Sequence, residues 1–215
     1  AGPLLLAVGT FVDKDIGQSF PFVDGSNTIT VSITGSVDIA AGSTITITGL
    51  TGTQTEDGTL AVTSSPADVF TSNEGTWAES TGTLTLTVDT GGLSAGTTCT
   101  VSFEVQNGGS EQNAVVGVVS GTIEVGGFDS PISDHNLEAD TTAVLYGVTG
   151  GESPLKLVEV AFDVASSIGQ SVPLVSASNT ITVTITVDHL LPSGSTVEIT
   201  GLTGTQTGDG TLTVT

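Results

Sequence analysis

The stretch Asn27–Gly35 reads NTITVSITG, and its apolar residues alternate with threonine and serine. Ile29, Val31 and Ile33 therefore share one face of an extended chain, because successive side chains of a strand point to opposite faces of the sheet. β-Branched residues are stiff about χ1 and fit a pleated sheet. The stretch predicts a strand with one face on a core and the other in water.

The same alternation recurs through the first 125 residues, between turns rich in Gly, Asp, Ser and Asn. In CTVSFEV it places the only cysteine, Cys99, on an inward face with Val101 and Phe103, where we expect a buried and unreactive thiol. No 3.6-residue apolar period is present, so the chain is predicted to be all-β. We expect seven strands here: Leu4–Val12, Thr28–Thr34, Thr44–Thr48, Thr59–Ser64, Thr83–Val88, Thr97–Val105 and Val115–Val125.

The chain repeats itself at an offset of 152 residues. Residues 16–63 and 168–215 are identical at about two thirds of their positions, and ITGLTGTQT occurs at 47–55 and again at 199–207. We interpret this phrase as the turn after the third strand, with Gly49 and Gly52 at positive φ and Leu50 folded back over the core. Repetition of this kind predicts domains in series.

From the repeat we infer that the chain is divided into three segments. Residues 1–126 are expected to form the first sandwich, and residues 127–152 an acidic connector in which TTAVLYGV could add a strand. Residues 153–215 are expected to form the first half of a second sandwich. The upstream segments PLLLAVGTFV and PLKLVEVAFDV match only in pattern.

Seven strands over this length is the size of an immunoglobulin-like domain. In NTITVSITG, STITITGLTG and TTCTVSFEVQN, and in its acidic, Thr-rich, cysteine-poor repetition, the chain resembles the Ig-like repeats of long extracellular fibres and surface adhesins. The resemblance implies tandem antiparallel β-sandwiches outside the cell or at its surface. The Cys…Trp…Cys pattern of antibody domains is absent, so a lectin-like or jelly-roll sandwich also stays open.

The second repeat contains counterparts of only the first four strands. Its inward residues, here called the assembly face, correspond to inward residues of the first repeat, which we expect to face the sheet containing Cys99. Exposure of these apolar side chains to water would cost several kcal/mol of stability, at about 25 cal/mol per Å2 of apolar surface. We expect cover from residues beyond Thr215, the favoured source, or from a neighbouring chain. The assembly face comprises Ile181, Val183, Ile185, Ile199 and Val214.

Either source of cover joins units head to tail, and repeated contacts of that type generate a fibre. Two findings would contradict the filament interpretation. One is an assembly face left bare to solvent in the working assembly. The other is a compact closed monomer in which residues 1–152 alone cover that face.

The net charge of the chain limits the classes of molecule that it is expected to bind. There are 23 acidic residues against two lysines, which gives −21. Such a surface repels nucleic acid phosphates and anionic lipids, so we expect no nucleic acid partner. No apolar run is long enough to insert across a membrane. The expected partners are copies of the chain in a head-to-tail polymer; O-glycans on Thr and Ser stay a hypothesis, and no N-glycosylation sequon occurs.

Residues for catalysis or metal binding are sparse. The two histidines are His135 and His189, and the first repeat has Val37 in place of His189, so no catalytic residue and no enzyme are predicted. Calcium is the best metal candidate, because hard cations bind several carboxylate oxygens. Solvated surface acids are the interpretation that we favour, and no other cofactor is expected. The candidate ligands are Asp129, Asp134, Glu138 and Asp140 in the connector.

These observations favour a structural role, as a repeat unit of an extracellular filament or surface stalk. Two alternatives stay open. One is a set of spacer repeats in a cell-surface adhesin, stiffened by calcium. The other is a carbohydrate-binding accessory module, for which only Trp77 and Tyr146 offer rings for stacking on sugars.

Overall fold

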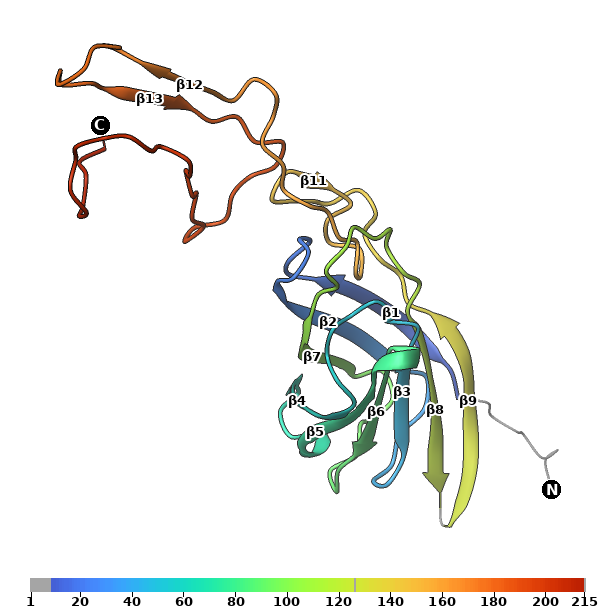
Figure 1. The fold of residues 1–215 in the computed structure, drawn as a ribbon. Coiled ribbons are helices and arrows are strands. Elements are labelled where there is room, and N and C mark those ends of the chain that lie inside the picture. Colours follow the sequence, from blue (N-terminus) through green and yellow to red (C-terminus); the bar gives the residue numbers. More distant parts are fainter. Residues whose placement is uncertain (1–8, 126, 215) are drawn as a thin grey trace, which may run out of the picture.

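The computed structural model describes residues 9–125 and 127–214. Residues 11–136 form one continuous nine-stranded antiparallel sheet that folds into two layers (Figure 1). The only helical element in the described part is a 3-10 turn at Glu79–Thr81. The prediction of an all-β sandwich is confirmed. Its strands are β1 (Phe11–Gln18), β2 (Ser26–Gly35), β3 (Thr44–Thr48), β4 (Gly58–Ser65), β5 (Phe70–Ala78), β6 (Thr83–Val88), β7 (Thr98–Gln106), β8 (Val118–Val125) and β9 (Phe128–Asn136).

The strand order is β1-β2-β7-β4-β5-β6-β3-β8-β9. Without the hairpin β5–β6, one layer is β1-β2-β7-β4 and the other is β3-β8-β9. These are the A-B-E-D and C-F-G sheets of the immunoglobulin fold. The hairpin is inserted between the fourth and fifth strands of that fold. It links the layers through β4, which pairs with β5 over residues 58–61 and with β7 over residues 62–65.

The opposite side of the sandwich is closed where β1 meets the chain that follows β9. The Ile16 amide donates to the Glu138 carbonyl at 2.9 Å, and the Glu138 amide donates to the Lys14 carbonyl at 2.7 Å. The Lys14 ammonium also lies 2.8 Å from the Glu138 carboxylate. These contacts pair an edge of β1 that β2 leaves free, and an unpaired strand edge is a site for unwanted association.

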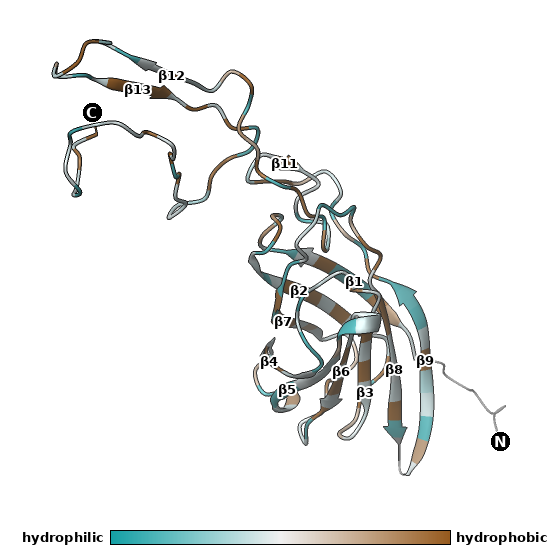
Figure 2. Cartoon of the chain, in the orientation of Figure 1, coloured by the Kyte–Doolittle hydropathy of each residue, from teal (hydrophilic) through white to brown (hydrophobic). Residues whose placement is uncertain are grey.

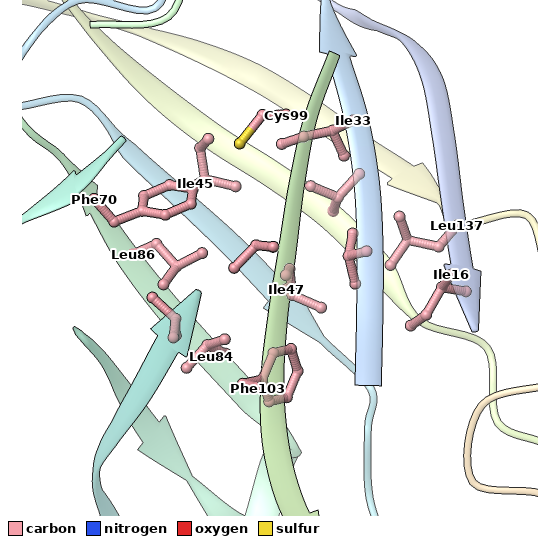
Figure 3. Packing of buried hydrophobic residues seen from close by; sticks show 14 of the residues in the cluster. Ile16, Ile33, Ile45, Ile47, Phe70, Leu84, Leu86, Cys99, Phe103 and Leu137 are labelled. Atoms are coloured by element: carbon pink, nitrogen blue, oxygen red, sulfur yellow. The ribbon is translucent and has the colours of Figure 1, made fainter. Parts of the chain in front are cut away.

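The core lies between the layers and is built from branched aliphatic side chains (Figures 2 and 3). Ile29, Val31 and Ile33 of β2 are at most 1% exposed, as their alternation predicts. Their neighbours on β7 are Phe103, Val101 and Cys99, in that order. The expectation that β2 faces these residues across the core is wrong, because β7 lies beside β2 in the same layer. The facing layer supplies Ile45, Ile47, Leu84 and Leu86.

Three strand predictions need correction. The first strand is Phe11–Gln18 rather than Leu4–Val12, because pairing with β2 carries it through Gln18; residues 1–8 lie outside the described part. Strand β5 was not predicted, because Ser72 and Asn73 have positive φ and shift its register, which breaks the alternation. Strand β9 was assigned to the connector, because only Ile132 in this polar edge strand is buried.

The repeated phrase at 47–55 behaves as predicted. Gly49 and Gly52 have φ of 86° and 88°, and Leu50 is fully buried. A Cβ on Gly49 would lie 2.6 Å from the Val116 carbonyl oxygen, so this turn requires glycine for space as well as for conformation. In the second copy, Gly201 and Gly204 have φ of 80° and 81°.

Beyond Glu138 the chain leaves the strands of the sandwich. The connector contains a short hairpin, β10 (Val144–Leu145) and β11 (Val148–Thr149), where one extra strand was expected. In the second repeat, β12 (Ser167–Gln170) pairs with β13 (Ile181–Thr184), and Ile168 lies opposite Val183 as Ile16 lies opposite Val31. Residues 196–200 and 210–214, expected as strands, are irregular because the part of the chain described here gives them no pairing partner.

We expect Cys99 to react with thiol reagents only as fast as the sandwich unfolds. The side chain is fully buried, and desolvation raises the pKa of the thiol to about 11, so little thiolate forms near pH 8. Time-resolved labelling of the native protein measures this rate, with protein in guanidinium chloride as the control for full reactivity. Fast labelling of the native protein contradicts the burial.

Candidate assembly interface

The assembly face of the second repeat is exposed. Ile181, Ile185 and Ile199 are 41%, 42% and 48% exposed, and Val214 is 93% exposed. Their first-repeat counterparts, Ile29, Ile33, Ile47 and Val62, are at most 4% exposed. Val183 is half-buried. Within the described residues, the first sandwich and the connector do not close over this face to make a compact monomer.

The difference in exposure between the two repeats arises from strand pairing. Strand β2 is paired on both edges, with β1 and with β7, whereas β13 pairs only with β12 within the described residues. The second repeat therefore presents a free strand edge together with an apolar face, and both features recruit further strands. The structure is of a single chain, so what covers this face in an assembly stays a prediction.

A second surface was not foreseen from the sequence. The segment Gly150–Val158, here called the clip, docks at the end of the first sandwich. It turns over residues 150–155, and Leu157 and Val158 then pair with the sandwich as isolated bridges. Leu157 exchanges two 2.9 Å backbone hydrogen bonds with Gln112, and the Val158 amide donates to the Pro21 carbonyl at 2.9 Å. Leu155 and Leu157 are 0% and 2% exposed. The clip thus completes the base of the first sandwich.

Three buried amides, Gln18, Asn27 and Asn107, form a hydrogen-bonded network here called the amide socket, and Gln18 is the member that bonds to the clip. Asn27 Nδ2 donates to Gln18 Oε1 and to Asn107 Oδ1, each at 2.9 Å. Gln18 Nε2 donates to the Gly151 and Lys156 carbonyls at 2.8 and 3.0 Å, and Gln18 Oε1 accepts from the Leu155 amide at 2.8 Å. Asn107 Nδ2 donates to the Phe20 and Phe22 carbonyls.

Each of these buried amides has partners for both its donor and its acceptor atoms, so the socket carries little desolvation penalty while the clip is in place. Removing the clip would leave the side chain of Gln18 with only the bond from Asn27. The sequence signal for the socket was the recurrence of Gln and Asn at the same places in both repeats, as Gln170 and Asn179. Residues of this type read there as turn formers.

The four calcium candidates do not form one cluster. Asp129 and Asp134 lie in β9, whereas Glu138 and Asp140 border an open groove of about 310 Å3 with Asp15 and Glu152. Among the described residues, no three His, Cys, Asp or Glu side chains are placed to hold a metal ion together.

The two calcium candidates at the groove, Glu138 and Asp140, already have hydrogen-bond partners within the chain. The hydrogen bond and charge of Lys14 lower the pKa of Glu138. The Thr142 hydroxyl and amide and the Ala143 amide lower the pKa of Asp140, since all three donate to its Oδ1. Both groups are therefore ionised at neutral pH, as surface carboxylates are.

The two histidines lie beside different partners, and the two candidate sugar-stacking aromatics also do. His135 Nε2 lies 2.9 Å from Thr10 Oγ1, and the ring of His189 lies 6.2 Å from that of Phe22. Trp77 is 1% exposed and donates from Nε1 to the Thr55 carbonyl, so its ring is not available to a sugar. The ring of Tyr146 lies 5.9 Å from that of Phe22 at the base of the sandwich.

No helix in the described residues is long and apolar enough to cross a membrane. No family model matches the chain, and no curated protein matches it. Solved structures similar to it include a collagen-binding domain from a Staphylococcus aureus adhesin, with 12% identity and a TM-score of 0.32 over 56% of this chain and 95% of that one. Another is AvmM, described as catalysing macrocyclization in alchivemycin A biosynthesis, with 10% identity and a TM-score of 0.32 over 92% of this chain and 100% of that one. The fold assignment rests on strand order, because likeness at this TM-score carries no argument.

Matched substitutions in the two repeats test the exposure difference. We expect Ile29→Ala to lower the free energy of unfolding by about 2–5 kcal/mol, since it opens a cavity in a closed core. We expect Ile181→Ala to change it by less than about 1 kcal/mol in the unassembled chain, as for a surface position. Chemical denaturation of dilute protein measures both, and equal losses would contradict an exposed second repeat.

Divalent ions should have a small effect. We expect the Tm in calcium to exceed that in chelator by less than about 10 °C, because ligand stabilisation grows with occupancy of a real site. Thermal melts followed by circular dichroism measure this, and magnesium serves as the control for ionic strength. A larger shift specific to calcium, lost in Asp140→Asn, would establish a structural site.

Proposed function

We propose that this chain is a structural repeat unit of an extracellular filament or surface stalk. In this proposal, β-sandwiches follow one another head to tail, and the assembly face of each open repeat is covered by strands from residues beyond Thr215 or from another copy. The observation that carries it is the contrast between the repeats, in which the same residues are buried in one and exposed in the other. Spacer repeats of an adhesin would use the same contacts but end in a separate binding domain.

The free energy of burying apolar side chains favours association that covers the assembly face. Burying one Ile or Val side chain stabilises by about 1.5–3 kcal/mol, so covering the five residues of the assembly face is worth several kcal/mol or more. Strand addition contributes further, because the free edge of β13 pairs its amides and carbonyls with the incoming strand. The contact is directional, since the register of β13 is set by its alternation.

The remaining surface supports a passive role. On the outer face of the first sandwich, hydroxyls pair across β2 and β7: Thr30 with Ser102 at 3.0 Å, and Ser32 with Thr100 at 2.9 Å. The charged residues are almost all acidic. A surface of one charge sign resists non-specific contact between units, so the apolar face is the favoured place of association. We infer no catalytic role.

Electron microscopy and sedimentation of the purified chain test the proposal. We expect ordered polymers that grow with concentration, and we expect Val183→Asp with Ile185→Asp to abolish them, because buried unpaired charge is costly. The matched control is Thr182→Asp on the opposite face of β13, which should assemble as the wild type does. Wild-type protein that stays monomeric at high concentration, or polymers unaffected by the double substitution, would refute the proposal.

A further inference from the structure

The clip is bound in the manner of a docked peptide. Its backbone pairs on one side with Gln112 and on the other with residues 21–23, where the Val23 amide donates to the Val158 carbonyl at 3.2 Å. Leu155 and Leu157 are buried, and Lys156 between them is half-buried, with its ammonium on the Thr149 carbonyl. The site therefore holds two buried leucines, the first in a turn with a φ of 51°, and a backbone that pairs at Leu157 and Val158.

The sequence contains the clip pattern twice. Pro154-Leu155-Lys156-Leu157 precedes the Ile-Gly-Gln-Ser of the second repeat, and Pro3-Leu4-Leu5-Leu6 precedes the Ile-Gly-Gln-Ser of the first. The spacing to that tetrapeptide differs by one residue. Both segments begin with proline, which has no backbone amide to donate. The docked clip uses only the carbonyl at this position, because the Pro154 carbonyl accepts from the Val115 amide at 3.0 Å.

Part of the socket is also present twice. In the second repeat, Asn179 Nδ2 donates to Gln170 Oε1 at 2.8 Å, as Asn27 does to Gln18 at 2.9 Å. Asn179 Oδ1 accepts from the Ser171 and Val172 amides at 3.1 and 2.9 Å, matching the bonds of Asn27 to residues 19 and 20. The hairpin is thus already in its docking conformation.

The difference is that the second hairpin is open. Gln170 and Asn179 are exposed, and Leu174 is 71% exposed where its counterpart Phe22 is 5% exposed. The Pro173 carbonyl and Val175 amide correspond to the two groups at Pro21 and Val23 that hold the backbone of Val158. A Pro-Leu-x-Leu segment would meet counterparts of Gln18, Asn27, Pro21 and Val23 here. Asn107 and Gln112 have no counterpart among residues 168–215, so the site offers part of the contacts that hold the clip.

We propose that the Gln170–Asn179 hairpin is a docking site for a Pro-Leu-x-Leu segment, and that its occupant is Pro3–Leu6 of a second copy of this chain. Leu4 and Leu6 take the places of Leu155 and Leu157. The carboxamide of Gln170 binds the Leu4 amide and the Leu5 carbonyl, as Gln18 binds the Leu155 amide and the Lys156 carbonyl. The first socket of each chain is filled by its own clip, which leaves the second hairpin as the free one. This inference rests on the proposed head-to-tail role and specifies its contact.

A labelled peptide of residues 1–8, AGPLLLAV, tests recognition directly. The full chain carrying Leu155→Ser and Leu157→Ser has an emptied first socket, and we expect saturable binding of the peptide measured by fluorescence anisotropy. Adding Gln18→Ala should weaken this binding about tenfold, as expected for loss of buried hydrogen bonds. The control peptide with Leu4→Ser and Leu6→Ser should not bind. Near-UV circular dichroism establishes that each variant retains a folded sandwich.

The wild-type chain reports on the second hairpin, since its first socket is filled. We expect weaker peptide binding that is lost in Gln170→Ala with Asn179→Ala and kept in the outward control Thr182→Ala. Absence of binding to the folded wild-type chain, or equal binding of the serine-substituted peptide, overturns the inference. Polymers that form undiminished in a Leu4→Ser, Leu6→Ser chain overturn it while the proposed function stands. Peptide binding without polymers of the wild-type chain supports the docking site and refutes the filament.

Discussion

Burial of one face of β2 is the constraint on which the rest of the structure depends. Ile29, Val31 and Ile33 project from one face of a strand whose other face carries Thr and Ser side chains. The alternation itself therefore determines which face meets the core and which meets water. Such a strand is stable only with a partner on each edge and a second layer across from it. Strands β1 and β7 supply the edges, and β3 and β6 supply facing side chains. The inserted hairpin β5–β6 connects the two layers, because it continues the sheet from β4 into the facing layer.

The two repeats show the same local sequence in two environments. The hairpin of Gln18 and Asn27 and that of Gln170 and Asn179 have the same strand register and nearly the same amide hydrogen bonds. These features form over about ten residues and need no distant partner. Burial does need distant partners, and Ile29 and Ile181 consequently differ in exposure by 41 percentage points. The open repeat is therefore organised at its turn but not at its core.

In the filament that we propose, this division accounts for the way in which one repeat unit joins the next. Turns that are formed in advance lower the entropy cost of docking, while the apolar face provides most of the favourable free energy. In the first repeat, the clip shows the finished contact, with buried leucines beside buried, fully paired amides. Buried amides of this kind add specificity of position, since a shifted clip would leave the carboxamide of Gln18 unpaired. A filament or stalk built from such contacts needs no cofactor and no charge pairing between units.

From the sequence alone, alternation determined the fold class, the inward faces of β2, β3, β6 and β7, the burial of Cys99 and the glycine turn at Gly49 and Gly52. It also determined that residues 181–214 carry an apolar face like that of the first repeat, because the two copies could be compared residue by residue. Only the tertiary structure decided the strand order, the strands β5 and β9, and the meeting of the clip with Gln18, Asn27 and Asn107. Strand β5 breaks its period at Ser72 and Asn73, and β9 has one buried side chain, so neither carries a periodic signal. The socket joins residues up to 138 positions apart through hydrogen bonds of side chains to backbone, and such contacts leave no spacing pattern in a single sequence.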